Sequence, residues 1–204
     1  TDPVGIAGSL TYNTNFNRMQ YCEGDEWVGI GGDGIPSSLA SGLVGHWTLD
    51  ETSGTTAFDS SGNGNDGTVY AGLAPATDSV AGIINTAYNF DGIDDRVGID
   101  TTASLNFADR NKITVAAWVK SDPLASADSI LMWEDVADSN GGEMRLGVLD
   151  SGGIKALFDV PDSTSTLHPA IGTTTLSPNT WYHIAGTYDG ANVKVYLNGV
   201  EEGS

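Results

Sequence analysis

The feature that most constrains the fold is a hairpin signature near the end of the sequence. Two alternating segments, residues 181–188 and 192–197, are separated by the dipeptide Asp189-Gly190. Alternation of apolar and polar residues is typical of a half-buried strand, and Asp-Gly is preferred in the tight turns that join antiparallel strands. A second such dipeptide, Asn198-Gly199, predicts a further strand directly after it. This part of the chain therefore favours an antiparallel sheet.

Similar short segments recur along the whole chain between turn-forming residues. The clearest of them are residues 43–49, 86–90, 96–99, 113–120, 130–133, 144–149 and 154–160. The 27 glycines, together with many Ser, Thr, Asn and Asp residues, supply the turns. No long stretch has an apolar period of 3.6 residues, so no long helix is expected. The sequence thus predicts an all-β protein.

The chain divides into two unequal parts. Residues 1–35 contain three short strand-like segments, at 9–13, 18–22 and 27–30. Three short strands bury little apolar surface, so we expect a small β-hairpin element that serves as a connector and leans on a neighbour or on other copies of itself. A Pro- and Ser-containing linker over residues 36–42 leads to the second part, residues 43–204.

The charge of the chain excludes some partners. Its 27 acidic residues outnumber its eight Lys and Arg, for a formal net charge of −19. No nucleic-acid partner is expected, because a basic footprint for phosphates is missing. No segment approaches the length of an apolar membrane span, so membrane insertion is not expected either. Most of the acidic residues are Asp, which suits turns and calcium-binding loops, with solubility as the alternative explanation.

Several sequence blocks occur in the order and spacing of laminin-G-like β-sandwiches. They are Gly45-His46-Trp47 with Asp50-Glu51, and residues 59–67, 89–97, 113–118, 181–190 and 195–199. From residue 43 onward the chain therefore resembles the concanavalin A-like lectin and glucanase superfamily. The resemblance implies a two-sheet antiparallel β-sandwich, or jelly roll, of a kind used more often to bind than to catalyse. Family members continue with further strands, so the resemblance also implies a domain that is incomplete at its C-terminus.

The N-terminal element has a resemblance of its own. The order Tyr12-Asn13, then residues 19–22, then Trp27 is similar to short hairpin units of bacterial surface and phage tail-fibre-like proteins. This resemblance implies a connector within a longer modular chain. It also implies an oligomer formed through residues 1–35.

The loop at residues 59–67 is the first candidate metal site. Asp59 and Asn63 have the spacing of the first half of a calcium loop, and Asp66 adds a carboxylate. The match fails where a bidentate Glu is needed, because Tyr70 stands there. Two interpretations stay open. Calcium could be shared by Asp59, Asn63 and Asp66 with oxygens from elsewhere, or the loop is an Asx turn with solvated carboxylates.

A second acidic cluster consists of Asp91, Asp94 and Asp95. The family resemblance implies a structural calcium near Asp94 and Asp95, completed by carbonyl oxygens and an acidic residue from a later strand. The alternative is a tight turn in which Asp94 or Asp95 pairs with Arg96.

A third acidic segment, residues 134–143, lies between two expected strands. The resemblance to pentraxin-like relatives places early calcium ligands at a binding face in this region. The ligand-binding candidates are Trp133, Asp135, Asp138, Asn140 and Glu143. Trp133 could stack on a sugar ring or pack in the core, and the acidic residues could simply be solvated. The other sandwich tryptophans, Trp47, Trp118 and Trp181, are expected in the core.

No catalytic arrangement is recognisable in the sequence. The closest carboxylate stretch, at Glu134, Asp135 and Asp138, lacks the spacing of glucanase acids and lies in a loop. The three histidines are scattered without triad spacing. The chain is therefore expected not to be an enzyme.

The expected function is a non-catalytic binding module, extracellular or on a cell or virion surface. It would recognise carbohydrate or a surface protein with the assistance of calcium. Two alternatives stay open: a structural spacer or tip domain of a surface adhesin or phage tail fibre, and an accessory domain of a polysaccharide-degrading enzyme.

Overall fold

The computed structural model describes residues 10–13, 18–23, 26–30, 42–70, 72–100, 102–105, 112–121, 127–134, 143–161 and 167–204. Before residue 42, and at 103, 127–129, 131–134 and 143, the description covers the backbone only. The chain divides into two compact units, Thr1–Asp109 and Arg110–Ser204, which we call the N-terminal and C-terminal units. The expected domain bounds, with one sandwich over residues 43–204, stay a prediction.

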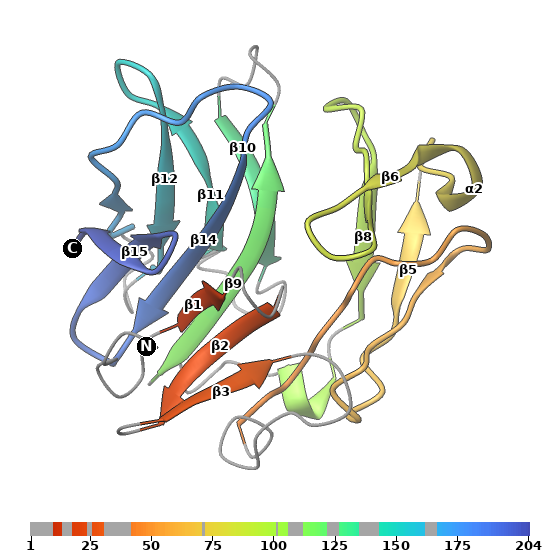
Figure 1. Cartoon of the computed structure of the whole chain (residues 1–204), viewed down its shortest axis with the longest axis horizontal. Coiled ribbons are helices and arrows are strands. Elements are labelled where there is room, and N and C mark those ends of the chain that lie inside the picture. The colour runs from red at the N-terminus through yellow and green to blue at the C-terminus, as the bar shows by residue number, and fades with distance from the viewer. Residues whose placement is uncertain are drawn as a thin grey trace. The chain divides into compact units, whose positions relative to one another are not determined.

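The N-terminal unit is built from short antiparallel strands (Figure 1). One sheet has the order β1 (Leu10–Asn13), β2 (Arg18–Glu23), β3 (Glu26–Ile30). A second has the order β4 (Thr56–Ala57), β5 (Gly67–Tyr70), β8 (Arg96–Ile99), and a third pairs β6 (Ser79–Ala81) with β7 (Thr86–Tyr88). The four-residue helix α2 (Pro75–Asp78) and the 3-10 turn η1 (Ala103–Leu105) complete its described elements. The three strands expected in residues 1–35 are confirmed, whereas their resemblance to tail-fibre-like hairpins stays a prediction.

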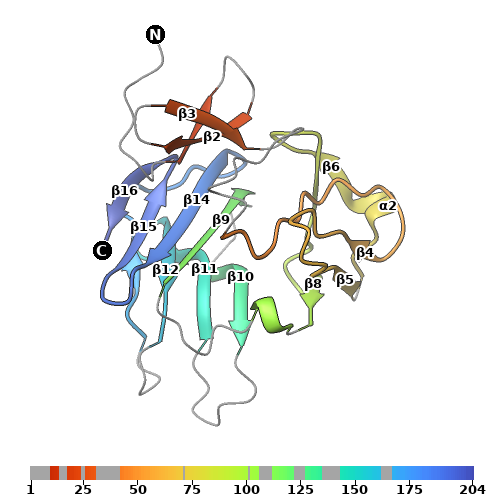
Figure 2. The same cartoon turned by 90° about the horizontal axis from the view of Figure 1, so that it is seen from below.

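The C-terminal unit consists of two four-stranded antiparallel sheets (Figures 1 and 2). The first has the order β16 (Val200–Gly203), β15 (Val193–Leu197), β14 (Trp181–Tyr188), β9 (Ile113–Lys120). The second has the order β10 (Ala127–Glu134), β11 (Glu143–Asp150), β12 (Ile154–Asp159), β13 (Ala170–Ile171). These sheets confirm the expected all-β, two-sheet antiparallel sandwich.

The turn between β15 and β16 shows why the hairpin signature is reliable. Asn198 and Gly199 have φ angles of 51° and 82°, which is the left-handed region that two-residue hairpin turns require. Asn and Gly tolerate this region better than other residues do. The strand expected directly after this dipeptide is β16, which pairs with β15.

The core of the C-terminal unit lies between its two sheets. Leu146 and Phe158 from one sheet and Ile184 and Val195 from the other are fully buried in one cluster. A Cβ atom at Gly186 would overlap the ring of Phe158, so this glycine makes room for the ring. Alternate positions of the strands therefore face a continuous apolar interior, as the sequence alternation predicts.

The expected core position of two tryptophans is wrong. On β9, the residues that contact the core are Ile113, Val115, Ala117 and Val119. Trp118 therefore alternates to the opposite face, where its ring meets that of His183 at a centroid distance of 5.4 Å. Trp181 also lies outside the core, with the Lys120 ammonium 5.1 Å from its ring centroid. Trp47, by contrast, packs against the smaller core of the N-terminal unit, as expected.

The strand expected at residues 43–49 is also wrong. The structure has only an isolated bridge there, between Trp47 and Asp59. The cause is the loop at residues 59–67, whose polar side chains bind the backbone groups that a neighbouring strand would use. Asn63 and Asn65 donate to the carbonyl oxygens of residues 43 and 44 at 2.8 and 2.6 Å. Asp59 accepts from the N–H of residue 46 at 2.9 Å.

Candidate metal centre

Asp59 is held by donors of its own chain. Its Oδ1 atom accepts from the backbone N–H groups of His46 and Ser61, both at 2.9 Å. Its Oδ2 atom accepts from the Ser61 hydroxyl at 2.7 Å and the Asn65 N–H at 3.0 Å. Burial favours a higher pKa for Asp59, but these hydrogen bonds together lower it below its ordinary value. Four donors occupy the acceptor positions of one carboxylate, which favours the Asx-turn interpretation of this loop.

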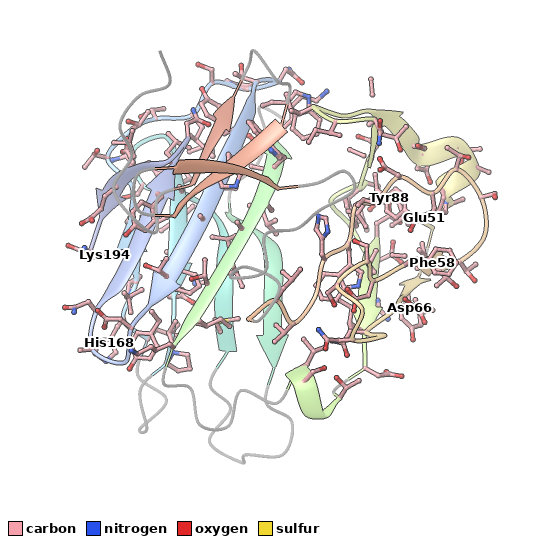
Figure 3. The ribbon with its side chains drawn as sticks, turned by 60° about the horizontal axis from the view of Figure 1, so that its bottom comes forward. Glu51, Phe58, Asp66, Tyr88, His168 and Lys194 are labelled. Atoms are coloured by element: carbon pink, nitrogen blue, oxygen red, sulfur yellow. The ribbon has the colours of Figure 1, made fainter. Side chains whose placement is uncertain are left out.

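The other two candidates in this loop also contact the chain itself. The exposed Asn63 donates to the carbonyl oxygen of Leu43, and Asp66 accepts from the Asp59 N–H at 2.8 Å. Asp66 lies near Phe58 at the margin of the unit (Figure 3). A calcium site shared by Asp59, Asn63 and Asp66 stays a prediction.

Asn65 is the residue of this loop that sequence reasoning missed. It is 1% exposed, and its amide donates to the carbonyl oxygen of Val44 and to the Ser104 hydroxyl, at 2.6 and 2.9 Å. Its side-chain oxygen accepts from Thr102 at 2.6 Å, and its backbone oxygen accepts from the indole of Trp47 at 2.8 Å. Asn65 therefore ties three separate segments together. No local signal distinguishes it from Asn63, because its partner Ser104 is 39 positions away.

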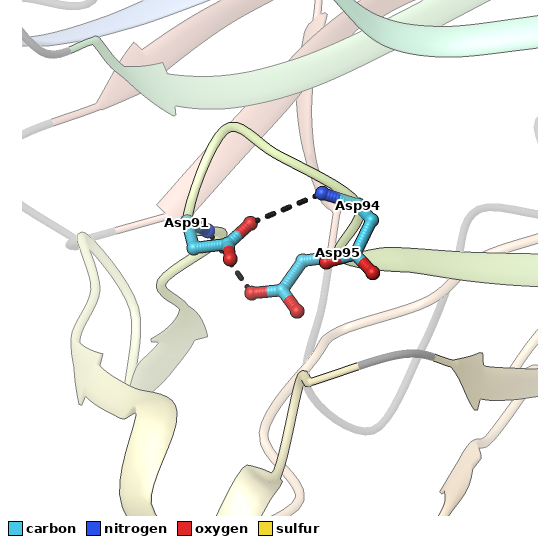
Figure 4. Close-up of side chains that lie close together, drawn as sticks. All are labelled: Asp91, Asp94 and Asp95. Carbon is cyan, nitrogen blue, oxygen red and sulfur yellow. Dashed lines mark hydrogen bonds between the residues drawn. The ribbon is translucent and has the colours of Figure 1, made fainter.

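The turn between β7 and β8 brings three carboxylates together. Asp91, Asp94 and Asp95 each offer a carboxylate oxygen, and these oxygens lie within 4.8 Å of one another (Figure 4). The chain reverses at Gly92, whose φ of 72° is in the left-handed region. The second acidic cluster of the sequence is thus a spatial cluster as well.

Backbone donors fix the geometry of this turn. The Oδ1 atom of Asp91 accepts from the N–H groups of Ile93 and Asp94 at 2.8 and 3.3 Å. The Oδ2 atom of Asp95 accepts from the Asp91 N–H at 3.0 Å. The hydrogen bond from Ile93 is the main cause that lowers the pKa of Asp91. Asp91 therefore stays ionised, as a cation ligand must.

One carboxylate oxygen of the acidic turn, in Asp95, is placed to bind a cation. The Oδ1 atom of Asp95 is buried and accepts no hydrogen bond from the residues that the structure describes. A buried carboxylate oxygen without a partner is unfavourable, and a bound cation would remove that penalty. The alternative in which Arg96 pairs with Asp94 or Asp95 is not observed among the described residues. The guanidinium of Arg96 instead lies 4.9 Å from the ring centroid of Tyr70.

The third acidic segment lies largely outside the described residues. This holds for Asp135, Asp138 and Asn140, and also for the side chains of Trp133 and Glu143. The backbone register pairs Trp133 with Met144, next to the pair of residues 134 and 143, so the two ends of the segment start from adjacent strand positions. Ligand binding at this segment stays a prediction.

Comparison with known proteins places the chain in a family. No curated protein matches it. In the part of the chain that the structure describes, no helix has the length and apolar character needed to cross a membrane. The model of the concanavalin A-like lectin/glucanases superfamily matches residues 91–204, more than half of the chain, beginning at the first carboxylate of the acidic turn. With its antiparallel sandwich, the chain therefore belongs to this superfamily of laminin-G-like domains.

Proposed function

We propose that this chain is a non-catalytic, extracellular binding module that recognises carbohydrate with the assistance of calcium. Laminin-G-like domains commonly bind glycans or proteins, are commonly extracellular and are usually non-catalytic, which supports the general class. The observation that carries the calcium part is the acidic turn of Asp91, Asp94 and Asp95. The roles as a fibre spacer or as an accessory domain of a hydrolase stay predictions, since no described contact favours either.

The chemistry of the turn suits calcium among common ions. Calcium binds six to eight oxygen ligands, often from carboxylates, backbone carbonyls and water. The turn offers only carboxylates, without the nitrogen or sulfur ligands that zinc favours. The N-terminal unit contains 15 acidic and two basic residues, so mutual repulsion also favours uptake of a divalent cation. A calcium ion held there could bind sugar hydroxyls through its remaining positions.

Thermal unfolding at increasing calcium concentrations tests whether the acidic turn binds calcium. Calcium that binds only the native state stabilises it by about 2.7 kcal/mol at a calcium concentration 100 times Kd. The melting temperature must therefore rise. Asp94→Asn removes a carboxylate that accepts no described hydrogen bond, so it should abolish the rise while leaving the calcium-free protein stable. The exposed Asp100 provides the matched control, and Asp100→Asn should retain the rise. An unchanged melting temperature at millimolar calcium would remove calcium from the proposal.

A glycan array tests the carbohydrate part. The wild-type protein is applied in calcium and again with a chelator, and Asp94→Asn is applied in calcium. We expect binding to a subset of glycans that weakens in the last two cases. A folded, calcium-loaded protein that binds no glycan would contradict carbohydrate recognition.

A further inference from the structure

A second segment of the chain, the one that follows β5, approaches the carboxylate of Asp95. β5 pairs with β8 in antiparallel register, with Tyr70 opposite Arg96. Continued by two positions, this register brings residue 72 beside the acidic turn that precedes β8. A Cβ atom at Gly72 would lie 3.4 Å from the Oδ1 atom of Asp95. The oxygen that accepts no hydrogen bond from the described residues is therefore the oxygen that faces Gly72.

Gly72 leaves an open space beside this oxygen. Among the described residues, and apart from its chain neighbours, the Asp95 Oδ1 atom is the one heavy atom within 4 Å of the Cβ position. At 3.4 Å that contact is an ordinary one, so packing does not exclude a side chain here. Gly98 differs, because a Cβ atom there would overlap the ring of Tyr70. The missing side chain at Gly72 thus keeps a polar space open, whereas the one at Gly98 accommodates a ring.

A cation bound to Asp95 would need this space. Calcium lies about 2.3–2.6 Å from its oxygen ligands, so a methyl group 3.4 Å from the same oxygen would intrude on the coordination shell. The carboxylate oxygens of the turn lie within 4.8 Å of one another and can hold the ion from one side (Figure 4). Gly72 stands at the Asp95 end of this cluster. Glycine is suited to that place, because it lets a backbone come close to a ligand.

We propose that Gly72 is a specificity-determining residue of the metal site, and that the ion joins the segment after β5 to the acidic turn. The inference rests on the proposed function, since it concerns the same ion. The backbone of Gly72 lies against the ion, where its polar groups can act as ligands. Leu73, which is 5% exposed and belongs to the core cluster, follows directly, and α2 begins two residues later. Calcium binding therefore rigidifies residues 72–78 as well as the turn.

Calorimetric titration with calcium chloride tests the role of Gly72. Gly72→Ala retains all three carboxylates and should weaken calcium affinity by roughly tenfold or more relative to wild type. Without calcium, its melting temperature should match that of wild type, because the added methyl group makes an ordinary contact. Gly42→Ala is the matched control in the same unit. It adds the same methyl group where nothing lies within 4 Å, so it should bind calcium as wild type does.

Hydrogen exchange of the wild-type protein provides a second readout. Calcium should slow amide exchange at residues 72–78 as well as at 91–95, because the ion contacts both segments. Exchange in β15 of the C-terminal unit serves as the reference and should not change. Gly72→Ala, at the same calcium concentration, should lack the added protection in both segments.

The outcomes separate this inference from the proposed function. Wild-type calcium affinity in Gly72→Ala, or added protection confined to residues 91–95, would overturn the inference and leave calcium binding by the turn intact. A lower melting temperature of the calcium-free variant would assign Gly72 to folding and would also overturn it. If the wild-type protein binds no calcium, the inference and the calcium part of the proposed function fail together.

Discussion

The two units of this chain are stabilised by different kinds of interaction. Among the described residues, eleven buried side chains form the apolar core of the C-terminal unit and four form that of the N-terminal unit. In the N-terminal unit, side chains such as Asp59 and Asn65 bind backbone groups of distant segments. Where there is little apolar surface to bury, polar side chains determine the path of the chain. Each unit should therefore be most sensitive to a different kind of substitution.

The largest effect is expected from Phe158→Ala in the C-terminal unit. Phe158 is fully buried over Gly186, and truncation of such a residue costs about 4 kcal/mol. Urea unfolding of wild type and variant measures the difference. Phe58→Ala serves as the control, because a ring that is 59% exposed should lose less than about 1 kcal/mol. Similar losses in the two variants would contradict the assignment of the core.

In the N-terminal unit, the substitution expected to lower stability most is Asn65→Ala, which removes a polar side chain. The substitution removes the hydrogen bonds that the buried Asn65 side chain forms with Thr102, Ser104 and the Val44 carbonyl oxygen, at a cost of about 3 kcal/mol. Asn63→Ala, at an exposed position in the same loop, should cost about 1 kcal/mol or less. Hydrogen exchange should show lost protection at residues 43–105 and little change at 113–203. A uniform loss across both ranges would show that the two units do not respond separately.

A pH dependence should distinguish the C-terminal unit. Burial lowers the pKa of His183 from 6.5 to about 4. Between these values the unfolded chain binds a proton that the folded chain does not, so stability is full above pH 6.5 and falls towards pH 4. The total loss from this residue is about 3 kcal/mol. His183→Phe keeps a ring against Trp118 and should flatten the curve over this range. An unchanged slope would assign the pH dependence to other groups.

The smallest effect compares two neighbouring glutamates on β16. Glu202 accepts four hydrogen bonds from the N–H groups and hydroxyls of Thr173 and Thr174, at 2.7 to 3.0 Å. Glu201 pairs with Lys194 in an exposed position. Glu202→Ala should cost about 2 kcal/mol and Glu201→Ala less than about 1 kcal/mol. Thermal unfolding in about 0.5 M salt sharpens the test, because salt strongly screens the ion pair of Glu201 with Lys194. Equal losses of stability in the two variants would contradict the larger contribution of Glu202.

The two units also differ in how much of them the sequence predicts. In the C-terminal unit, alternation and turn dipeptides predict β9, β14 and β15 almost residue by residue. Alternation alone does not say which side of a strand faces the interior, so the sequence places Trp118 in the core, whereas the structure places its neighbours Ala117 and Val119 there. In the N-terminal unit, residues 43–49 alternate but form no strand, because their partners are side chains from residues 59–67. The sequence predicts the acidic turn as a cluster of Asp residues. The buried Asp95 oxygen that accepts no hydrogen bond from described residues, and the contact of Arg96 with the Tyr70 ring, depend on the three-dimensional structure.

The saturated carboxylate of Asp59 has a consequence for how the protein matures. Because donors of the chain fill its acceptor positions, the loop at residues 59–67 can reach its final conformation in a calcium-poor environment. The acidic turn at Asp91 has an oxygen left over, so under the proposed function it is the part that would sense the ion. A newly made chain could then fold first and load calcium later. Its binding activity would switch on only after it reaches a calcium-rich compartment.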